Sequence, residues 1–219
     1  DGVAVMANET PMVRDMIARM KAEGVPVVAL VTDQHETGRD HFVGIDNVAA
    51  GRSAGVLMGR FLGGRRGAVI VLVNSTPARD MVERRLGFDE VLSARFPALE
   101  VLPSLECHDN HEEAHRLVAR VLGRRDDVVG IYRAGAGLRG VTQAVTEPGR
   151  DDLVIIGHEL TSHSRAALEA RLVDAVITQN VGHIVRSAVR ILRAHCGGVD
   201  VIPSQELIRI EIMLKENLP

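Results

Sequence analysis

Short apolar runs rich in valine and isoleucine alternate along the whole chain with longer stretches of helical periodicity. Because the runs are apolar at nearly every position, they predict strands buried on both faces, as in a parallel sheet covered by helices. The predicted strands are Val3–Ala7, Val27–Val31, Phe42–Ile45, Ala68–Val73, Val101–Leu105, Val128–Tyr132, Leu153–Gly157, Asp174–Thr178 and Leu207–Ile212. The predicted helices are Pro11–Glu23, Gly51–Leu62, Met81–Phe96, His111–Leu122, Leu138–Thr146, Ser162–Ala170 and Val181–His195. This alternation indicates an α/β fold of the doubly wound type.

The first part of the chain is short of core-forming elements. Before the polar segment 32–47 it holds only two predicted strands and one helix, which is too little to bury a core. A long polar connection after a strand end is a common place for a ligand loop or a crossover between lobes. We therefore expect further strands to precede Asp1.

Composition narrows the possible functions. The chain has 219 residues, enough for one large domain or two small lobes. Its net charge is −3 and no basic cluster stands out, so this stretch alone is a poor binder of nucleic acid. Two cysteines cannot form a disulfide framework, and no apolar run approaches the ~18 residues of a membrane span. The chain opens on a strand-like run, so we expect no secretory signal peptide.

Two motifs suggest enzymatic chemistry, and each has a simpler interpretation. His111 and His115 fit H-E-x-x-H, in which two histidines on one helical face bind zinc. The surrounding run is hydrophilic and offers no evident third ligand, which favours a solvated helix. The run 135–140 fits G-x-G-x-x-G after a strand, with Glu159 near the spacing of a ribose-binding acid. Glycines there also serve a tight turn without any dinucleotide.

Other polar residues come at or near the carboxyl ends of predicted strands, where open α/β sheets bind ligands. Arg84 follows the strand Ala68–Val73 at a short distance, and Gln179 directly follows Asp174–Thr178. Asn47 is interpreted as part of a helix-capping region. Since no nucleophile or metal constellation accompanies these groups, they indicate binding without turnover. We expect no enzyme activity, cofactor or metal.

Several short motifs, specific in their combination and order, resemble one family. They are Gly24-Val25-Pro26-Val27-Val28, Val43-Gly44-Ile45-Asp46-Asn47, Gly51 with Ala54-Gly55, Glu83-Arg84-x-x-Gly87-Phe88, Gly157-His158-Glu159, Gln179, Glu211-Ile212 and the tail Glu216-Asn217-Leu218-Pro219. Over nearly the whole chain they are similar to the effector-binding core of lactose-repressor (LacI-type) transcription regulators. That core is itself similar to periplasmic sugar-binding proteins of type I.

The resemblance implies two Rossmann-like lobes with parallel sheets, the first incomplete at its N-terminus. The N-terminal lobe would comprise residues 1–45 and 179–207, and the C-terminal lobe residues 46–178 and 208–219. It also implies a helix-turn-helix headpiece upstream of Asp1 that binds DNA, a homodimer, and a sugar or sugar-like effector held between the lobes.

Site residues carried over from the family come from both predicted lobes. Arg84 matches the family's ligand-binding arginine, Glu159 stands where many members have aspartate, and Gln179 matches the glutamine of the second crossover. Further ligand contacts are expected at Asn8, Glu9, Thr32, Asp33, Arg133 and Ala134. Glutamate in place of aspartate, and Arg133 or Ala134 in place of asparagine, leave the identity of the ligand open.

Two functions follow from this resemblance. The first is a cytoplasmic regulator whose DNA binding responds to a sugar or sugar-like effector. The alternative is a periplasmic sugar-binding receptor of an ABC transporter. Neither function involves contact of this chain with a membrane.

Overall fold

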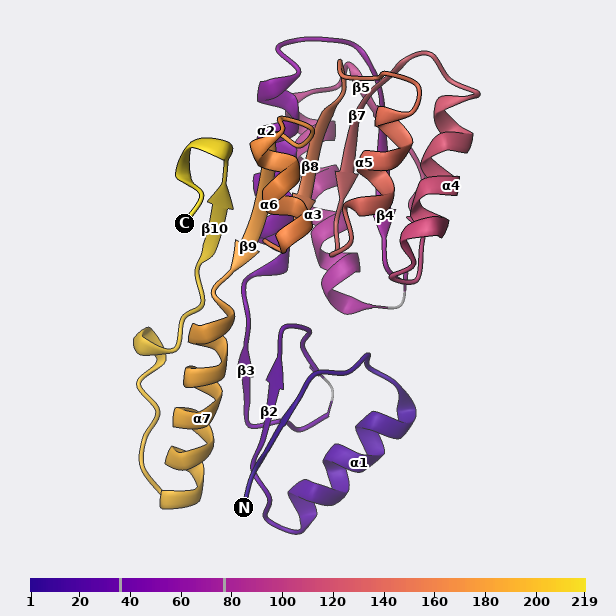
Figure 1. The fold of residues 1–219 in the computed structure, drawn as a ribbon. Helices are drawn as coiled ribbons and strands as arrows, with labels where there is room; N and C mark the ends of the chain where they lie inside the picture. Colours follow the sequence, from indigo (N-terminus) through magenta and orange to yellow (C-terminus); the bar gives the residue numbers. More distant parts are fainter. Residues whose placement is uncertain (36, 77) are drawn as a thin grey trace. The chain divides into compact units, whose positions relative to one another are not determined.

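The computed structural model describes residues 1–35, 37–76 and 78–219. The chain divides into two compact units (Figure 1). The smaller unit consists of Asp1–Asp46, Pro77–Asp80 and Gln179–Ile210, and the larger unit of Asn47–Thr76, Met81–Thr178 and Glu211–Pro219. Both units are α/β, which confirms the predicted fold class.

The smaller unit contains a three-stranded parallel sheet in the order β1-β2-β3. Its strands are β1 (Val3–Val5), β2 (Val27–Leu30) and β3 (His41–Val43), and its helices are α1 (Pro11–Ala22), α7 (Val181–Gly197) and the 3-10 helix η1 (Pro203–Gln205). The two long helices lie on either side of the sheet (Figure 1). Helix α1 begins where the Thr10 hydroxyl accepts a hydrogen bond from the Val13 amide. Gly24 follows its end with φ +75, a conformation that favours glycine.

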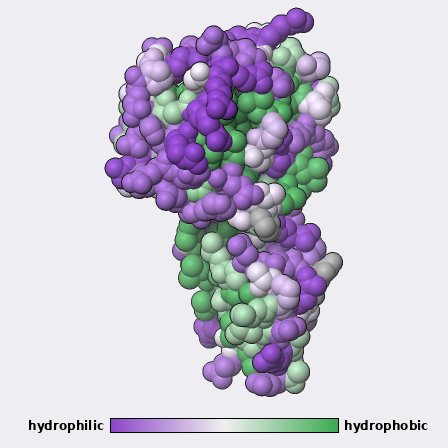
Figure 2. All heavy atoms as spheres, turned by 90° about the vertical axis from the view of Figure 1, so that its right-hand side faces the viewer, coloured by the Kyte–Doolittle hydropathy of each residue, from purple (hydrophilic) through white to green (hydrophobic). Residues whose placement is uncertain are grey.

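Part of the apolar surface of the smaller unit is exposed. Met12 and Met16 on α1 are solvent-exposed, as are Val181, Val185 and Val189, which follow one another at four-residue spacing on α7. In the view of Figure 2, apolar atoms cover more of the smaller unit than of the larger one. A valine stripe of this kind usually packs against another element.

The larger unit contains a seven-stranded sheet in the order β10-β9-β8-β7-β4-β5, with β6 paired to β4. Its strands are β4 (Gly67–Val73), β5 (Leu99–Val101), β6 (Leu105–Glu106), β7 (Val128–Arg133), β8 (Val154–His158), β9 (Ala175–Gln179) and β10 (Ile210–Met213). Its helices are α2 (Asn47–Phe61), α3 (Arg79–Arg95), α4 (His111–Leu122), α5 (Arg139–Thr146), α6 (Ser162–Glu169) and η2 (Lys215–Asn217). The pairs from β5 and β6 through β4, β7 and β8 to β9 are all parallel. Their carboxyl ends therefore meet at one edge of the sheet.

Two sequence predictions need correction in the larger unit. The predicted strand Val101–Leu105 is two short strands, β5 and β6, separated by an irregular stretch that contains Pro103. Proline cannot donate a ladder hydrogen bond, so it interrupts the pairing with β4. Helix α2 begins at Asn47, four residues before the predicted start at Gly51.

Two glycines bring α2 and α3 into backbone contact. A Cβ atom on Gly51 would lie 2.0 Å from the Arg84 carbonyl oxygen, and one on Gly87 would lie 2.1 Å from that of Val48. No larger side chain fits at either position without separating the two helices. The close approach fixes the position of Arg84 relative to the start of α2.

None of the described helices is both long and apolar enough to cross a membrane.

Replacing Gly87 with alanine is expected to destabilise the larger unit by about 1–3 kcal/mol, the usual cost of forcing atoms into a packed contact. The free energy of unfolding, measured by urea titration and circular dichroism, checks this value. Gly197→Ala on α7 is the matched control, because the nearest atom to a Cβ there is 3.9 Å away. Equal stabilities of Gly87→Ala and the wild type would contradict the packing assignment.

Candidate functional site

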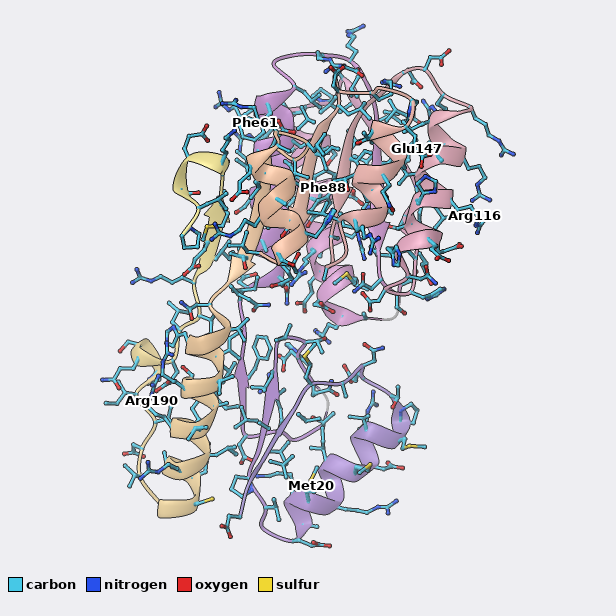
Figure 3. All side chains as sticks on the ribbon, viewed as in Figure 1. Met20, Phe61, Phe88, Arg116, Glu147 and Arg190 are labelled. Carbon is cyan, nitrogen blue, oxygen red and sulfur yellow. The ribbon has the colours of Figure 1, made fainter. Side chains whose placement is uncertain are left out.

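The candidate site lies at the carboxyl edge of the larger sheet, where polar residues follow β4, β7 and β8. Asn74 follows β4, Arg133 ends β7 and is followed by Ala134, and Glu159 follows β8. Arg84 reaches the same edge from α3, whose Phe88 lies against the sheet (Figure 3). Such an edge is the usual ligand-binding side of an open α/β sheet.

Arg84 is fully buried, with 1% of its surface exposed. Its Nε donates to Asn47 Oδ1 at 2.9 Å, and its Nη1 donates to the Ala134 carbonyl oxygen at 2.7 Å. Its Nη2 is buried and has no hydrogen-bond partner among the described residues. The guanidinium is thus held by two bonds, while a third nitrogen is available to a ligand.

The carboxylate of Glu159 forms an ion pair with this nitrogen. Its Oε1 lies 3.8 Å from Arg84 Nη2, and about a quarter of its side chain is exposed. Its φ is +67, an unusual conformation for a residue with a Cβ. Hydrogen bonds on both sides hold this backbone: the Glu159 amide donates to the Ile177 carbonyl, and the Ser164 hydroxyl and the Thr161 amide donate to the Glu159 carbonyl.

A layer of aromatic and imidazole rings lies on one face of the sheet at this edge. Tyr132 stacks on Phe88 with ring centroids 4.4 Å apart, and its hydroxyl lies 2.9 Å from His158 Nε2. Burial lowers the pKa of His158 well below its ordinary value, and the charges of Arg84 and Arg133 lower it further. Burial likewise raises the pKa of Tyr132. Both rings are neutral at physiological pH.

Arg133 and Ala134 contribute in different ways. Arg133 is 1% exposed. Its Nη2 donates to Asn74 Oδ1, and its Nη1 donates to the Leu72 carbonyl at 3.4 Å. Its Nε is buried and has no hydrogen-bond partner among the described residues. Ala134 provides its backbone carbonyl to Arg84. The sequence analysis missed Asn74, although a polar residue directly after a buried strand is a usable signal, and it gave Asn47 only a capping role.

The predicted residues of the smaller unit are placed as follows. Asp33 is buried, and its carboxylate oxygens accept hydrogen bonds from Arg39 and from the Gln34 amide. His35 Nδ1 lies 2.6 Å from Asp33 Oδ2. Burial opposes ionisation, but the bond and charge of Arg39, the Gln34 amide and His35 together outweigh it and lower the pKa of Asp33. Glu9 accepts a bond from Arg14 at 3.0 Å. Thr32 is buried, Asn8 is exposed, and Gln179 is buried at the end of β9.

Gln34 is a further buried polar residue that the sequence analysis missed. Its side-chain amide donates to the Ala7 carbonyl and so links the segments that follow β1 and β2. Its Oε1 is buried and finds no hydrogen-bond partner in residues 1–35, 37–76 and 78–219.

The structure favours the simpler interpretation of both enzyme-like motifs. His115 Nε2 lies 2.9 Å from a Glu147 oxygen, and the described residues contain no group of three or more side chains suited to a metal ion. Of the motif glycines, Gly140 packs against α4, where a Cβ would lie 2.0 Å from the His111 carbonyl. Gly137 has φ +91 and allows the turn into α5.

Comparisons with known proteins agree on a family and a fold. The family model described as "Periplasmic binding protein domain" matches residues 1–199. A xylitol-binding protein of Mycolicibacterium smegmatis is 27% identical over 160 residues, which is 72% of this chain and 45% of that protein. The chain thus spans less than half the length of this curated relative.

Solved structures superpose on the chain at low sequence identity, so they show the fold alone. The glucose-galactose binding protein GanP of Geobacillus stearothermophilus has a TM-score of 0.90 at 23% identity, covering 100% of this chain and 78% of that one. A solute binding protein of an ABC transporter from Burkholderia graminis, in complex with D-arabinose, has a TM-score of 0.90 at 21% identity, covering 99% and 76%. A chain of a XylFII-LytSN complex has a TM-score of 0.89 at 23% identity, covering 99% of this chain and 77% of that one.

The buried His158 predicts a loss of stability in mild acid. Its folded-state pKa lies below its unfolded-state value of about 6.5, so below that pH the unfolded chain binds the extra proton. The free energy of unfolding is expected to fall by up to about 1.4 kcal/mol per pH unit as pH drops below 6.5. Urea titrations at pH 7.5, 6.0 and 5.0 measure this slope.

His158→Gln is expected to reduce the slope, leaving the contributions of His41 and His163, whose pKa values burial also lowers. Tyr132→Phe, which keeps the imidazole buried, is the control and retains the slope. An unchanged slope in His158→Gln would contradict the assignment.

Proposed function

Because the chain belongs to the periplasmic binding protein domain family, we propose that it is a receptor for a small polyhydroxylated molecule, a sugar or a sugar alcohol. The observation that carries the proposal is the Arg84 guanidinium, buried and fixed by Asn47 and Ala134, with its unpartnered Nη2 3.8 Å from Glu159. The ligand binds at this edge of the larger unit and is released without any chemical change.

The arrangement suits a hydroxyl group. A hydroxyl accepts from a guanidinium and donates to a carboxylate at the same time, so it satisfies both members of the pair. Bonds to ionised groups are stronger than neutral ones, typically about 1.5–3 kcal/mol each. A buried N–H without a partner costs free energy, which a bound hydroxyl removes.

The names of the similar proteins support a sugar or polyol. They mention xylitol, D-arabinose, glucose and galactose, and one further structure, from Agrobacterium vitis, contains alpha-D-tagatopyranose. These proteins are solute-binding proteins, so the comparisons favour the receptor over the regulator that the sequence analysis put first. The comparisons reported above give no support to LacI membership, DNA binding or a homodimer.

A solute receptor acts with a membrane transporter or a sensor, so we propose such a partner for this chain. The proposal places the protein outside the cytoplasmic membrane, in place of the cytoplasmic location expected for a regulator. Cell fractionation with an antibody is expected to find it in the extracytoplasmic fraction, and recovery with cytoplasmic markers would contradict this location. The expected ligand contacts of Asn8, Glu9, Thr32, Asp33 and Gln179 stay part of the proposal.

Titration calorimetry with xylitol, D-arabinose, D-tagatose, D-glucose and D-galactose tests the function. Arg84→Ala is expected to weaken binding of the tightest of these by about 100-fold, because it removes a charged hydrogen bond. Glu159→Gln is expected to weaken binding about 10-fold.

The matched control is Arg85→Ala, the same substitution one residue further along α3. The Arg85 side chain bonds Asp89, Ser104 and the Leu102 carbonyl and does not reach Ala134. Native affinity in a folded Arg84→Ala variant would remove Arg84 from the site. Conversion of any sugar by the wild-type protein would contradict a pure receptor.

A further inference from the structure

Two buried guanidinium groups flank one residue, Ala134. Arg133 precedes it in the chain, and Arg84 bonds its carbonyl oxygen at 2.7 Å. Each arginine is 1% exposed. Each also has one buried nitrogen, Arg133 Nε and Arg84 Nη2, that no described residue meets in a hydrogen bond. Two unpartnered cationic donors therefore occupy the same edge of the sheet.

Most partners of these two arginines are neutral. They are the side-chain amides of Asn47 and Asn74 and the backbone carbonyls of Leu72 and Ala134. Cys107 also faces Arg133, and burial raises the pKa of its thiol, so it carries no compensating charge at neutral pH. A cation removed from water is costly unless an opposite charge accompanies it.

Two carboxylates reduce this excess of positive charge. Glu159 lies 3.8 Å from Arg84 Nη2, beyond hydrogen-bond distance, and a quarter of its side chain is exposed. Asp109 attracts Arg133 electrostatically and lies in an exposed turn. Within the described part of the chain, neither carboxylate forms a hydrogen bond with Arg84 Nη2 or Arg133 Nε, so both buried nitrogens can still donate to an oxyanion.

The backbone next to Arg133 is also suited to an anion. The glycine-containing turn 135–137 leads into α5, and Leu138 at its N-cap position makes no side-chain capping bond. The N-cap side chain therefore accepts no bond from the first amides of α5, and the positive end of the helix dipole lies at this turn. Gly137 lies next to Arg133, because a Cβ there would be at an ordinary contact distance, 3.6 Å, from Arg133 Nη2.

Resting on the proposed function, we propose that the ligand is an anionic sugar derivative, a polyol chain bearing a carboxylate or a phosphate. Its oxyanion accepts hydrogen bonds from Arg133 and Arg84, and its hydroxyls bind near Glu159. Carboxylates and phosphates share the geometry that a guanidinium recognises through two N–H groups. This class differs from the neutral sugars in the names of the similar proteins.

Calorimetry on matched ligands tests the charge directly and needs no mutation. The probes are xylitol and D-arabinitol, their aldonates D-xylonate and D-arabinonate, and their 5-phosphates. The tightest anionic member is expected to bind at least about 10-fold more tightly than the neutral alditol of the same configuration, because it makes an additional charge-assisted bond. Comparing the aldonate with the phosphate shows which oxyanion the site takes.

The same titrations on Arg133→Gln locate the preference. The ratio of anionic to neutral affinity is expected to fall to about 1, since the variant keeps the polyol contacts near Glu159 and loses one cation. Arg116→Gln, which removes an exposed arginine paired with Glu113 on α4, is the control for net charge and keeps the ratio. If Arg133→Gln does not fold, Arg133→Lys replaces it, and loss of bidentate binding is expected to lower the ratio.

Each outcome distinguishes the two proposals. Neutral alditols or sugars binding as tightly as the anions, or more tightly, would overturn the anionic class and leave the receptor function standing. Binding of neither class would overturn both. A ratio that is unchanged in folded Arg133→Gln would overturn the role of Arg133.

Discussion

The contact between Arg84 and its two fixed acceptors is the interaction on which the site depends. It joins three elements of the larger unit, because Arg84 belongs to α3, Asn47 begins α2 and Ala134 follows β7. The acceptors are within reach only because Gly51 and Gly87 allow α2 and α3 to touch at their backbones. A buried guanidinium is costly without such partners, so packing and binding chemistry are coupled here.

The cost of burying a charge also keeps the rings next to these arginines neutral. Phe88, Tyr132 and His158 are buried against the sheet, and burial together with the nearby arginine charges keeps the imidazole neutral. A protonated imidazole would add a third cation to an edge that already holds two. The rings instead hold the end of β7 rigidly, and positive charge is confined to the two guanidinium groups.

The sequence predicted most of the fold because each strand and helix carries its own periodicity. Helix α4 has the predicted bounds. The predicted strand Val101–Leu105 is wrong, because residues 99–106 form two short strands on either side of Pro103. Arg84 and Glu159 were predicted through a family resemblance, and the structure places them 3.8 Å apart. The bonds of Asn74 and Asn47 to the arginines, and the Tyr132–His158 contact, join residues distant in the chain. No local pattern encodes such contacts.

The side chains of Arg84 and Glu159 differ in how firmly the protein holds them, and this difference affects which ligands the site selects. Arg84 is buried and held by two bonds, so its remaining donor has a fixed direction. Glu159 has a backbone fixed by Ile177 and Ser164, but its side chain is partly exposed. A rigid donor beside an adjustable acceptor orients one ligand group strictly while tolerating variation in its neighbour. The group that the arginines bind therefore decides which ligands are accepted.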